Sequence, residues 1–202
     1  MGLFSKDIAT FDDLFVHGLQ DIYYAENQIL KALPKLIEAT TNLQLERSLK
    51  EHLKVTEGHV SRLEQIFEMR EEKPKGTKCY GINGLISEGD EIAGNISDTR
   101  VLDAAIISAA QAVEHYEITR YGSLIAWATE MGRNDFADIL RETLAEEQAT
   151  DERLTAMAEK VINKRAAGRP VAQSRTRRAS SSGQAKKRPA RKVSKAGARK
   201  SA

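Results

Sequence analysis

The chain has 202 residues, the length of about one domain, and its 31 Lys and Arg against 29 Asp and Glu give a formal net charge of +2. A single cysteine excludes a disulfide framework and any Cys-based zinc or iron–sulfur site, and it suits a reducing compartment. No apolar run approaches the roughly 18 residues that a membrane-spanning helix needs, and the N-terminus has no secretory signal. We therefore expect a cytoplasmic protein without a membrane partner.

The small net charge conceals two parts of opposite charge. Residues 164–202 hold 14 of the Lys and Arg and no Asp or Glu, so residues 1–163 hold the other 17 and all 29 acidic residues. The net charges are therefore +14 for the tail and −12 for the body. The tail is Ala/Lys/Arg/Ser low-complexity sequence with too few apolar side chains to offset the entropy of ordering. We expect one folded domain over 1–163 and a disordered tail over 164–202.

The body consists of long, proline-poor stretches rich in Ala, Leu, Glu, Gln and Lys, which favour helix. Pro34 should kink or shorten the first of these helices. In chain order, helices are predicted near 10–39, 43–71, 99–130 and 134–163.

Two short turns and one long connection join the predicted helices. The turns at 40–42 and 131–134 make two antiparallel hairpins. The connection between the hairpins contains Gly and Pro breakers around an apolar patch at Ile82, Leu85 and Ile86, which indicates a short helix inside it. The predicted fold is all-α: a four-helix bundle of two antiparallel hairpins with one long crossover.

Each predicted helix carries an apolar stripe at alternating steps of three and four residues, the spacing of a helix that packs in a bundle. Every stripe is apolar at its ends and has acid, His or hydroxyl side chains at its middle. The four stripes are Leu19, Ile22, Glu26, Ile29 and Leu33; Leu45, Leu49, His52, Thr56, His59, Leu63 and Ile66; Ile107, Ala110, Glu114, Glu117, Tyr121 and Leu124; and Phe136, Leu140, Thr143, Glu147, Thr150, Leu154 and Met157.

The polar residues of both predicted hairpins lie near the middle of the bundle when they are counted from the turns, so we expect them to meet there. Counted from the turns, Glu26 should face Glu57 with His59 nearby, and Glu117 should face about position 146, beside Glu146 and Glu147. Each buried ion costs several kcal/mol, so clustered carboxylates must be protonated, paired with Lys or Arg, or bound to metal. The stripes contain no Lys or Arg, and oxygen-rich ligands with imidazole suit iron or manganese.

The metal hypothesis has an alternative for each residue taken alone. A single glutamate of this kind is more often a partly solvated residue at the flank of a helix, and a single histidine is more often hydrogen-bonded in the core. Glutamates on facing helices, however, are how di-iron bundle sites are built. The candidate metal ligands are Glu26, Glu57, His59, Glu114, Glu117 and Glu147.

Five segments that follow one another over about residues 10–160 carry a family resemblance. They are DIYYAENQILKALPKL, HLKVTEGHVSRLEQIF, KCYGINGLISEG, DAAIISAAQAVEHYEITRYG and TLAEEQATDERL. In these segments the chain resembles the YciE/YciF family of bacterial ferritin-like proteins. The resemblance implies a ferritin-like four-helix fold and a role in stress responses. Members of the family are often named as ferroxidases, and related bundles use iron pairs to oxidise ferrous iron or reduce peroxide.

The general ferritin-like pattern carries over to particular residues. Glu26 matches the glutamate of the first helix, Glu114 and Glu117 match the Glu-x-x-Glu of rubrerythrin-like proteins, and Glu147 matches the glutamate of the fourth helix. Neither Glu-x-x-His pair of the pattern is present. The resemblance thus implies a carboxylate-rich site for up to two iron ions, or manganese, and a homodimer, which is common among ferritin-like bundles.

The basic tail indicates a polyanionic partner. Its 14 positive charges without aromatic residues suit contacts to phosphates rather than base stacking. It resembles the tails of linker histones, which implies sequence-independent DNA binding. The alternatives are that it folds against an acidic body or only aids solubility. The residues expected to contact phosphates are Arg175, Arg177, Arg178, Lys186, Lys187, Arg188, Arg191, Lys192, Lys195, Arg199 and Lys200.

Two functions of different classes follow from these features. The first is a cytoplasmic stress protein whose bundle binds iron and oxidises ferrous iron or reduces peroxide, with the tail holding this chemistry near DNA in the nucleoid. The second is a metal-free structural or nucleoid-associated bundle in which the tail is the functional part.

Overall fold

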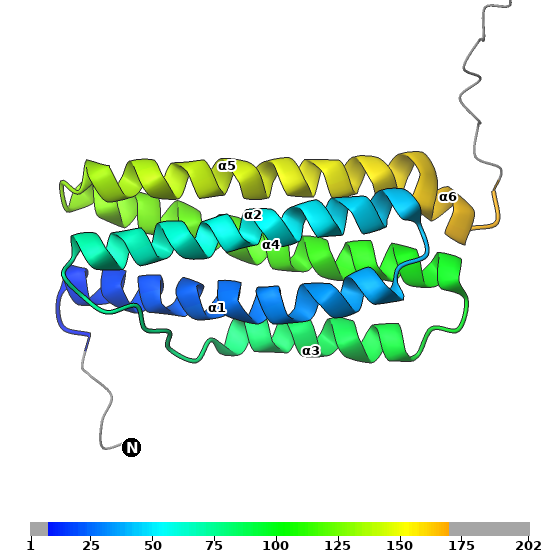
Figure 1. Ribbon diagram of the computed structural model, residues 1–202, viewed down its shortest axis with the longest axis horizontal. Helices are drawn as coiled ribbons and strands as arrows, with labels where there is room; N and C mark the ends of the chain where they lie inside the picture. The colour runs from blue at the N-terminus through cyan, green and yellow to red at the C-terminus, as the bar shows by residue number, and fades with distance from the viewer. Residues whose placement is uncertain (1–7, 170–202) are drawn as a thin grey trace, which may run out of the picture. The chain divides into compact units, whose positions relative to one another are not determined.

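The computed structural model describes residues 8–169, and its elements are helical (Figure 1). No strand occurs within this range, so the all-α prediction is confirmed. The tail from residue 170 onward lies outside the described residues. The helices are α1 (Phe11–Ala39), α2 (Leu43–Met69), α3 (Tyr80–Gly94), α4 (Thr99–Glu130) and α5 (Asn134–Met157), followed by a π-helical segment (Ala158–Ile162) and α6 (Asn163–Ala166).

Local side-chain chemistry explains where the long helices begin and end. The Thr10 side chain accepts a hydrogen bond from the Asp13 backbone N–H at 3.0 Å, and the Asp13 carboxylate accepts one from the Thr10 backbone N–H, which forms a capping box at the start of α1. Asn42 caps α2, and Gly132 adopts a φ of 73° in the turn between α4 and α5. Pro34 does not end α1, which continues to Ala39.

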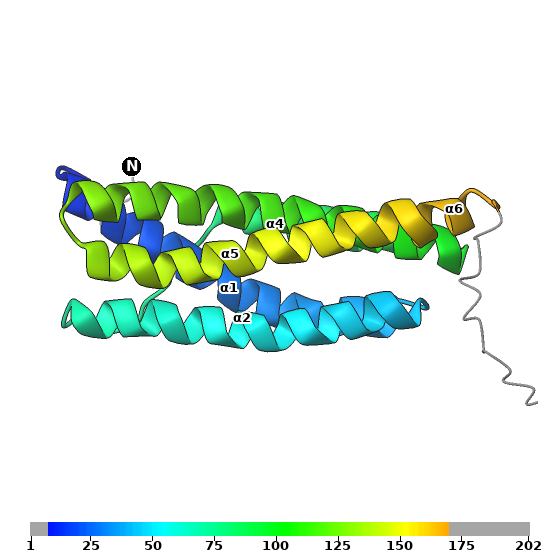
Figure 2. The same cartoon turned by 90° about the horizontal axis from the view of Figure 1, so that it is seen from above.

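The predicted hairpins and crossover are present (Figures 1 and 2). α1 packs along α2, α4 packs along α5, and contacts between α1 and α4 and between α2 and α5 join the two hairpins into a four-helix bundle. The short helix expected in the crossover is α3, which packs against α1 and α4 outside the bundle. A feature that the sequence did not reveal is the π-helical segment, where one continuous helix to residue 163 was expected.

The core confirms the predicted stripes, because each of their residues is buried. Apolar side chains fill the parts of the bundle on either side of its middle; for example, the rings of Phe15 and Phe136 stack with centroids 5.8 Å apart. The polar members of the stripes meet between these apolar parts. None of the helices between residues 8 and 169 combines the length and the apolar composition needed to span a bilayer.

Candidate metal centre

Buried carboxylates and imidazoles from four helices converge at the middle of the bundle. Their candidate ligand atoms form two overlapping groups, and within each group these atoms lie within 4.8 Å of one another. Glu147 belongs to both groups, so its carboxylate lies between two adjacent candidate metal positions. One group is His52, Glu114, Glu117 and Glu147, and the other is Glu26, His59 and Glu147.

The two ring nitrogens of His59 have different surroundings. Nε2 lies 3.0 Å from Oε2 of Glu146, whose carboxylate accepts two hydrogen bonds from Arg62 at 2.7 and 2.9 Å. These bonds lower the pKa of Glu146, so its carboxylate is ionised and His59 Nε2 is the donor. Nδ1 points into the cluster, 2.9 Å from Glu147 Oε1 and 3.4 Å from Glu26 Oε1, but without hydrogen-bond geometry. A histidine that binds metal typically donates its other N–H to a carboxylate in this way.

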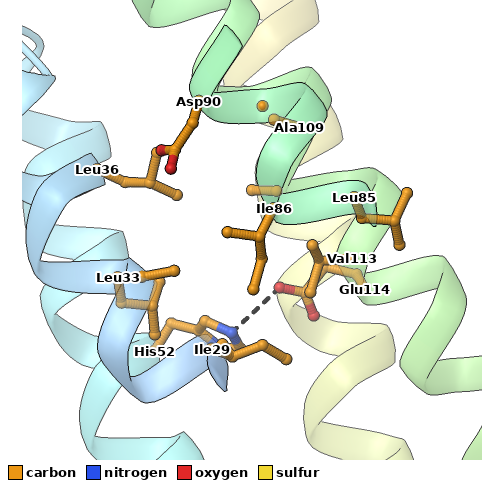
Figure 3. A pocket seen from close by; sticks show the side chains of 13 residues that line it. Ile29, Leu33, Leu36, His52, Leu85, Ile86, Asp90, Ala109, Val113 and Glu114 are labelled. Atoms are coloured by element: carbon orange, nitrogen blue, oxygen red, sulfur yellow. Dashed lines mark ion pairs between the residues drawn. The ribbon is translucent and has the colours of Figure 1, made fainter. Parts of the chain in front are cut away.

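The second histidine, His52, contacts the cluster from the same helix. Its Nε2 lies 3.2 Å from Glu114 Oε1, and both side chains are almost fully buried (Figure 3). Burial lowers the pKa of His52, which keeps the ring neutral and able to offer a lone pair. His52 was part of the predicted stripe but not among the predicted ligands. The signal that could have identified it is its position seven residues before His59 on the same face of α2.

Burial sets the protonation of the acids when no cation is present. It raises the pKa of Glu26, and together with the charge of Glu147 it raises the pKa of Glu114 to about 11 and that of Glu117 well above its ordinary value. Tyr121, whose pKa is also raised by burial, donates a hydrogen bond to Glu26 Oε1. The metal-free centre therefore holds protons that a cation would displace.

His59 also holds an exchangeable proton. Burial lowers its pKa, but the carboxylates of Glu147 and Glu26 outweigh burial and raise it to about 10. A cation bound among these carboxylates would neutralise their negative charge in place of this proton.

Most polar atoms of the cluster have no hydrogen-bond partner. Buried polar atoms in folded proteins are nearly always paired, and leaving one unpaired costs about 1–3 kcal/mol. Between residues 8 and 169 the fully buried polar side chains include no Lys or Arg that could pair with the acids. The atoms without a hydrogen bond are Glu26 Oε2, His52 Nδ1, His59 Nδ1, Glu114 Oε2, both carboxylate oxygens of Glu117 and both of Glu147. Two of them, His59 Nδ1 and Glu147 Oε1, form an ion pair when His59 is protonated.

The donor set fits a pair of transition-metal ions. Four carboxylates and two imidazoles suit iron or manganese. Ferritin-like di-metal sites use the same numbers, with one Glu from each of two helices and a Glu-x-x-His from each of the other two. Here the two histidines both come from α2, and two of the glutamates, Glu114 and Glu117, come from α4.

The structure brings together five of the six predicted ligands and corrects the sixth. Glu57 is exposed on α2 and belongs to neither group. It directly follows buried Thr56, and one residue turns a helix by about 100°, which directs Glu57 away from the seam. The count from the turn was accurate to about two residues, so His59 takes the place facing Glu26. The predicted phosphate-contacting residues between 175 and 200 lie outside the described residues.

Comparison with known proteins identifies relatives over most of the chain. The family described as "Domain of unknown function (DUF892)" matches residues 10–167. Protein YciF of Escherichia coli K12 is 43% identical over 161 residues, which cover 79% of this chain and 97% of YciF. The resemblance noted in the sequence is thereby confirmed.

Solved structures give the same result for the fold. YcfI of Rhodopseudomonas palustris, described as a candidate structural protein, is 54% identical with a TM-score of 0.74, and the match covers 76% of this chain and 98% of that one. The crystal structure of the E. coli stress protein YciF matches with a TM-score of 0.74 over 78% of this chain and 99% of YciF. A Xanthomonas campestris protein that is 18% identical, with a TM-score of 0.62, shares the fold.

Proposed function

The chain belongs to the DUF892 family and is a homologue of the E. coli stress protein YciF, and on this basis we propose that its bundle binds two ferrous ions per chain and oxidises them. The observation that carries this proposal is the set of buried, unpartnered carboxylate and imidazole atoms at the middle of the bundle. A pair of cations would give these atoms partners, and no buried Lys or Arg in the described part of the chain does so.

The overlap of the two groups supports a pair of ions rather than one. His52, Glu114 and Glu117 would hold one ion, Glu26 and His59 would hold the other, and Glu147 would lie between them. Four carboxylates supply up to four negative charges, which equals the charge of two ferrous ions. Manganese suits the same ligands and is the second candidate.

Ferrous iron is the substrate in this account. Two ferrous ions give up one electron each, and an acceptor takes both electrons with two protons, so that dioxygen yields hydrogen peroxide or hydrogen peroxide yields two water molecules. The carboxylates stabilise the higher positive charge of the ferric products. The protons on Glu114, Glu117 and His59 in the metal-free protein would leave as iron binds.

Anaerobic loading with ferrous iron, followed by addition of an oxidant, tests the proposal. Ferric iron formed per chain would be followed by absorbance in the wild-type protein and in Glu147→Gln. Glu57→Gln is the matched control, because it removes a charge from an exposed glutamate of α2. We expect oxidation to depend on Glu147 and not on Glu57. Equal rates in all three proteins would contradict the proposal.

We also propose that the basic tail binds polyanions, DNA first, as the second function of the chain. The supporting observation is the 14 Lys and Arg over residues 164–202 without an acidic residue. If about 6–10 phosphates are contacted, affinity should fall roughly 10³–10⁵-fold between 50 and 200 mM salt. A truncation after Arg169 is the appropriate test, because α6 extends to Ala166 and would be kept intact.

The truncation also separates the two functions. We expect it to abolish retardation of DNA in a gel and to leave ferrous oxidation unchanged. If DNA binding is the only activity detected and the full chain binds no metal, the protein is a structural or nucleoid-associated bundle instead.

A further inference from the structure

A small cavity connects the outside of the bundle with the candidate metal centre. It has a volume of about 50 Å³ and lies between α1, α3 and α4 (Figure 3). At its inner end are His52 and Glu114, which are joined by the dashed line in the figure. Its wall is formed mainly by Ile29, Leu33 and Leu36 of α1, Leu85 and Ile86 of α3, and Val113 of α4.

The outer end of the cavity differs from the inner one. There Asp90 of α3 is exposed and forms a 3.5 Å ion pair with Lys35 of α1. Between Asp90 and the His52–Glu114 pair, the lining residues carry no charge. The cavity is therefore an apolar passage between the solvent and one side of the centre.

α3 gives the cavity its outer wall. Gly89 allows α3 to lie close to α4, because a Cβ atom at this position would be only 3.2 Å from the Ala109 Cβ. Ile86, one turn earlier, projects into the space between α1 and α4 (Figure 3). The crossover helix thus encloses a space beside the bundle that the four bundle helices alone would leave open.

The size of the cavity restricts what it can hold. One water molecule needs about 10–15 Å³ on this measure, whereas an apolar cavity of about 150 Å³ accepts benzene. A volume of about 50 Å³ suits a molecule of a few atoms and is well below that of the cavity that accepts benzene.

The chemistry of the wall restricts the ligand further. An ion crossing it would lose its hydration without a charged partner, at a cost of several kcal/mol. Hydrogen peroxide donates and accepts hydrogen bonds, and it would find no partner until it reached His52 and Glu114. Apolar cavities take up apolar molecules, and the wall between the polar ends of this one is lined by apolar side chains.

We propose that this cavity is a binding site for dioxygen, which it brings to the His52–Glu114 side of the centre. The proposal rests on the proposed function and makes dioxygen, rather than hydrogen peroxide, the oxidant that reaches the iron by this route.

Xenon, an apolar probe of similar size, tests the site without metal or turnover. Crystals of the metal-free full-length protein under xenon pressure should show xenon between Ile86 and Val113. Ile86→Phe should abolish this xenon and Ile86→Ala should increase its occupancy. Ile92→Phe, at an exposed position of the same helix, should leave it unchanged. A wild-type cavity that takes no xenon, or that contains a chain of ordered waters, would overturn the proposal.

Oxidation kinetics test the same site with its ligand. In protein loaded with ferrous iron, Ile86→Phe should slow the reaction with dioxygen by about tenfold, a barrier increase of about 1.4 kcal/mol, and leave the reaction with hydrogen peroxide unchanged. Equal slowing of both reactions, or of neither, would contradict the proposal. If the protein binds no iron, the proposed function fails, while the xenon result still decides whether the cavity admits an apolar gas.

Discussion

His59 Nδ1 lies 2.9 Å from Glu147 Oε1, while the Nε2 of the same ring is held by Glu146 at 3.0 Å. Adjacent glutamates of α5 thus contact the two sides of one imidazole, one in the core and one at the edge of the bundle. Arg62 fixes the outer glutamate through two hydrogen bonds. Glu146 and Arg62, which are not among the candidate ligands, therefore orient the His59 ring so that its Nδ1 faces the candidate metal centre.

Substitution of Glu146 should weaken metal binding without removing a ligand. Glu146→Gln loses the charge that holds Arg62 and the proton of His59 Nε2, and loss of such a partner typically costs 10–100-fold in metal affinity. Competition with a chelator of known affinity measures the effect. Glu142→Gln is the control, because Glu142 is exposed and contacts Arg62 at 3.4 Å without touching His59. Equal affinities for Glu146→Gln and the wild type would show that the ring needs no such support.

The metal-free protein should lose stability as pH rises. The pKa of Glu114 is about 11 in the folded chain, above its unfolded value of about 4.3. The stability that protonated Glu114 contributes is therefore fully present below its pKa in the unfolded chain, and it decreases as the pH rises toward 11. His59 has a pKa of about 10 in the folded chain, so its contribution to stability also decreases as the pH rises above its unfolded pKa of about 6.5. Each such group lowers the free energy of unfolding by about 1.4 kcal/mol per pH unit inside its window.

Urea unfolding with a chelator present, at several pH values between 7 and 9, measures this slope. Glu114→Gln should make the slope shallower, because the amide does not titrate, whereas Glu57→Gln at the exposed position should not change it. A stability that rises over this range would contradict the protonation described for the centre.

Metal affinity should have the opposite pH dependence. A cation must displace the protons held by Glu114, Glu117 and His59, so binding releases protons and strengthens as pH rises. Calorimetric titration with manganese, in buffers of different ionisation enthalpy, counts the protons released. Affinity that is independent of pH between 6 and 8 would mean that the ligands are already deprotonated.

Removal of the Tyr121 hydroxyl should destabilise the metal-free protein. Tyr121→Phe leaves Glu26 Oε1 without its donor in a fully buried position, and we expect a loss of about 1–3 kcal/mol. Tyr80→Phe, at a position that is 78% exposed, is the matched control. Bound metal should reduce the loss, because the carboxylate would then have another partner. An unchanged free energy of unfolding in Tyr121→Phe would contradict this role.

The sequence was sufficient for the four stripes because helical periodicity alone determines which residues share a face. Counting residues from the two turns then placed Glu26, Glu114, Glu117 and Glu147 near the middle of the bundle. It failed between Glu57 and His59, because counting from a turn has an error of about two residues, enough to turn a side chain from the core to the solvent. The face of α2 was the better guide, since Glu57 lies off the stripe that contains both histidines.

Two features, a π-helical segment and a cavity, could not be predicted from the sequence pattern because they depend on how the helices pack. The π-helical segment at Ala158–Ile162 has the same composition as ordinary helix. The cavity beside His52 arises only where α3 lies across α1 and α4, and its lining residues come from four different helices. The short helix itself was predictable from its apolar patch, but the helices that it packs against were not.

Metal content is the most direct test of the central claim, that the buried acids and histidines form a metal centre. Protein purified without chelator or nickel affinity, and loaded anaerobically with ferrous iron, would be measured by plasma mass spectrometry. We expect about two ions per chain, lost in a Glu117→Ala/Glu147→Ala double variant and kept in Glu57→Ala. A wild-type protein that binds no metal after ferrous loading would contradict the claim, and the basic tail would then be the functional part of the chain.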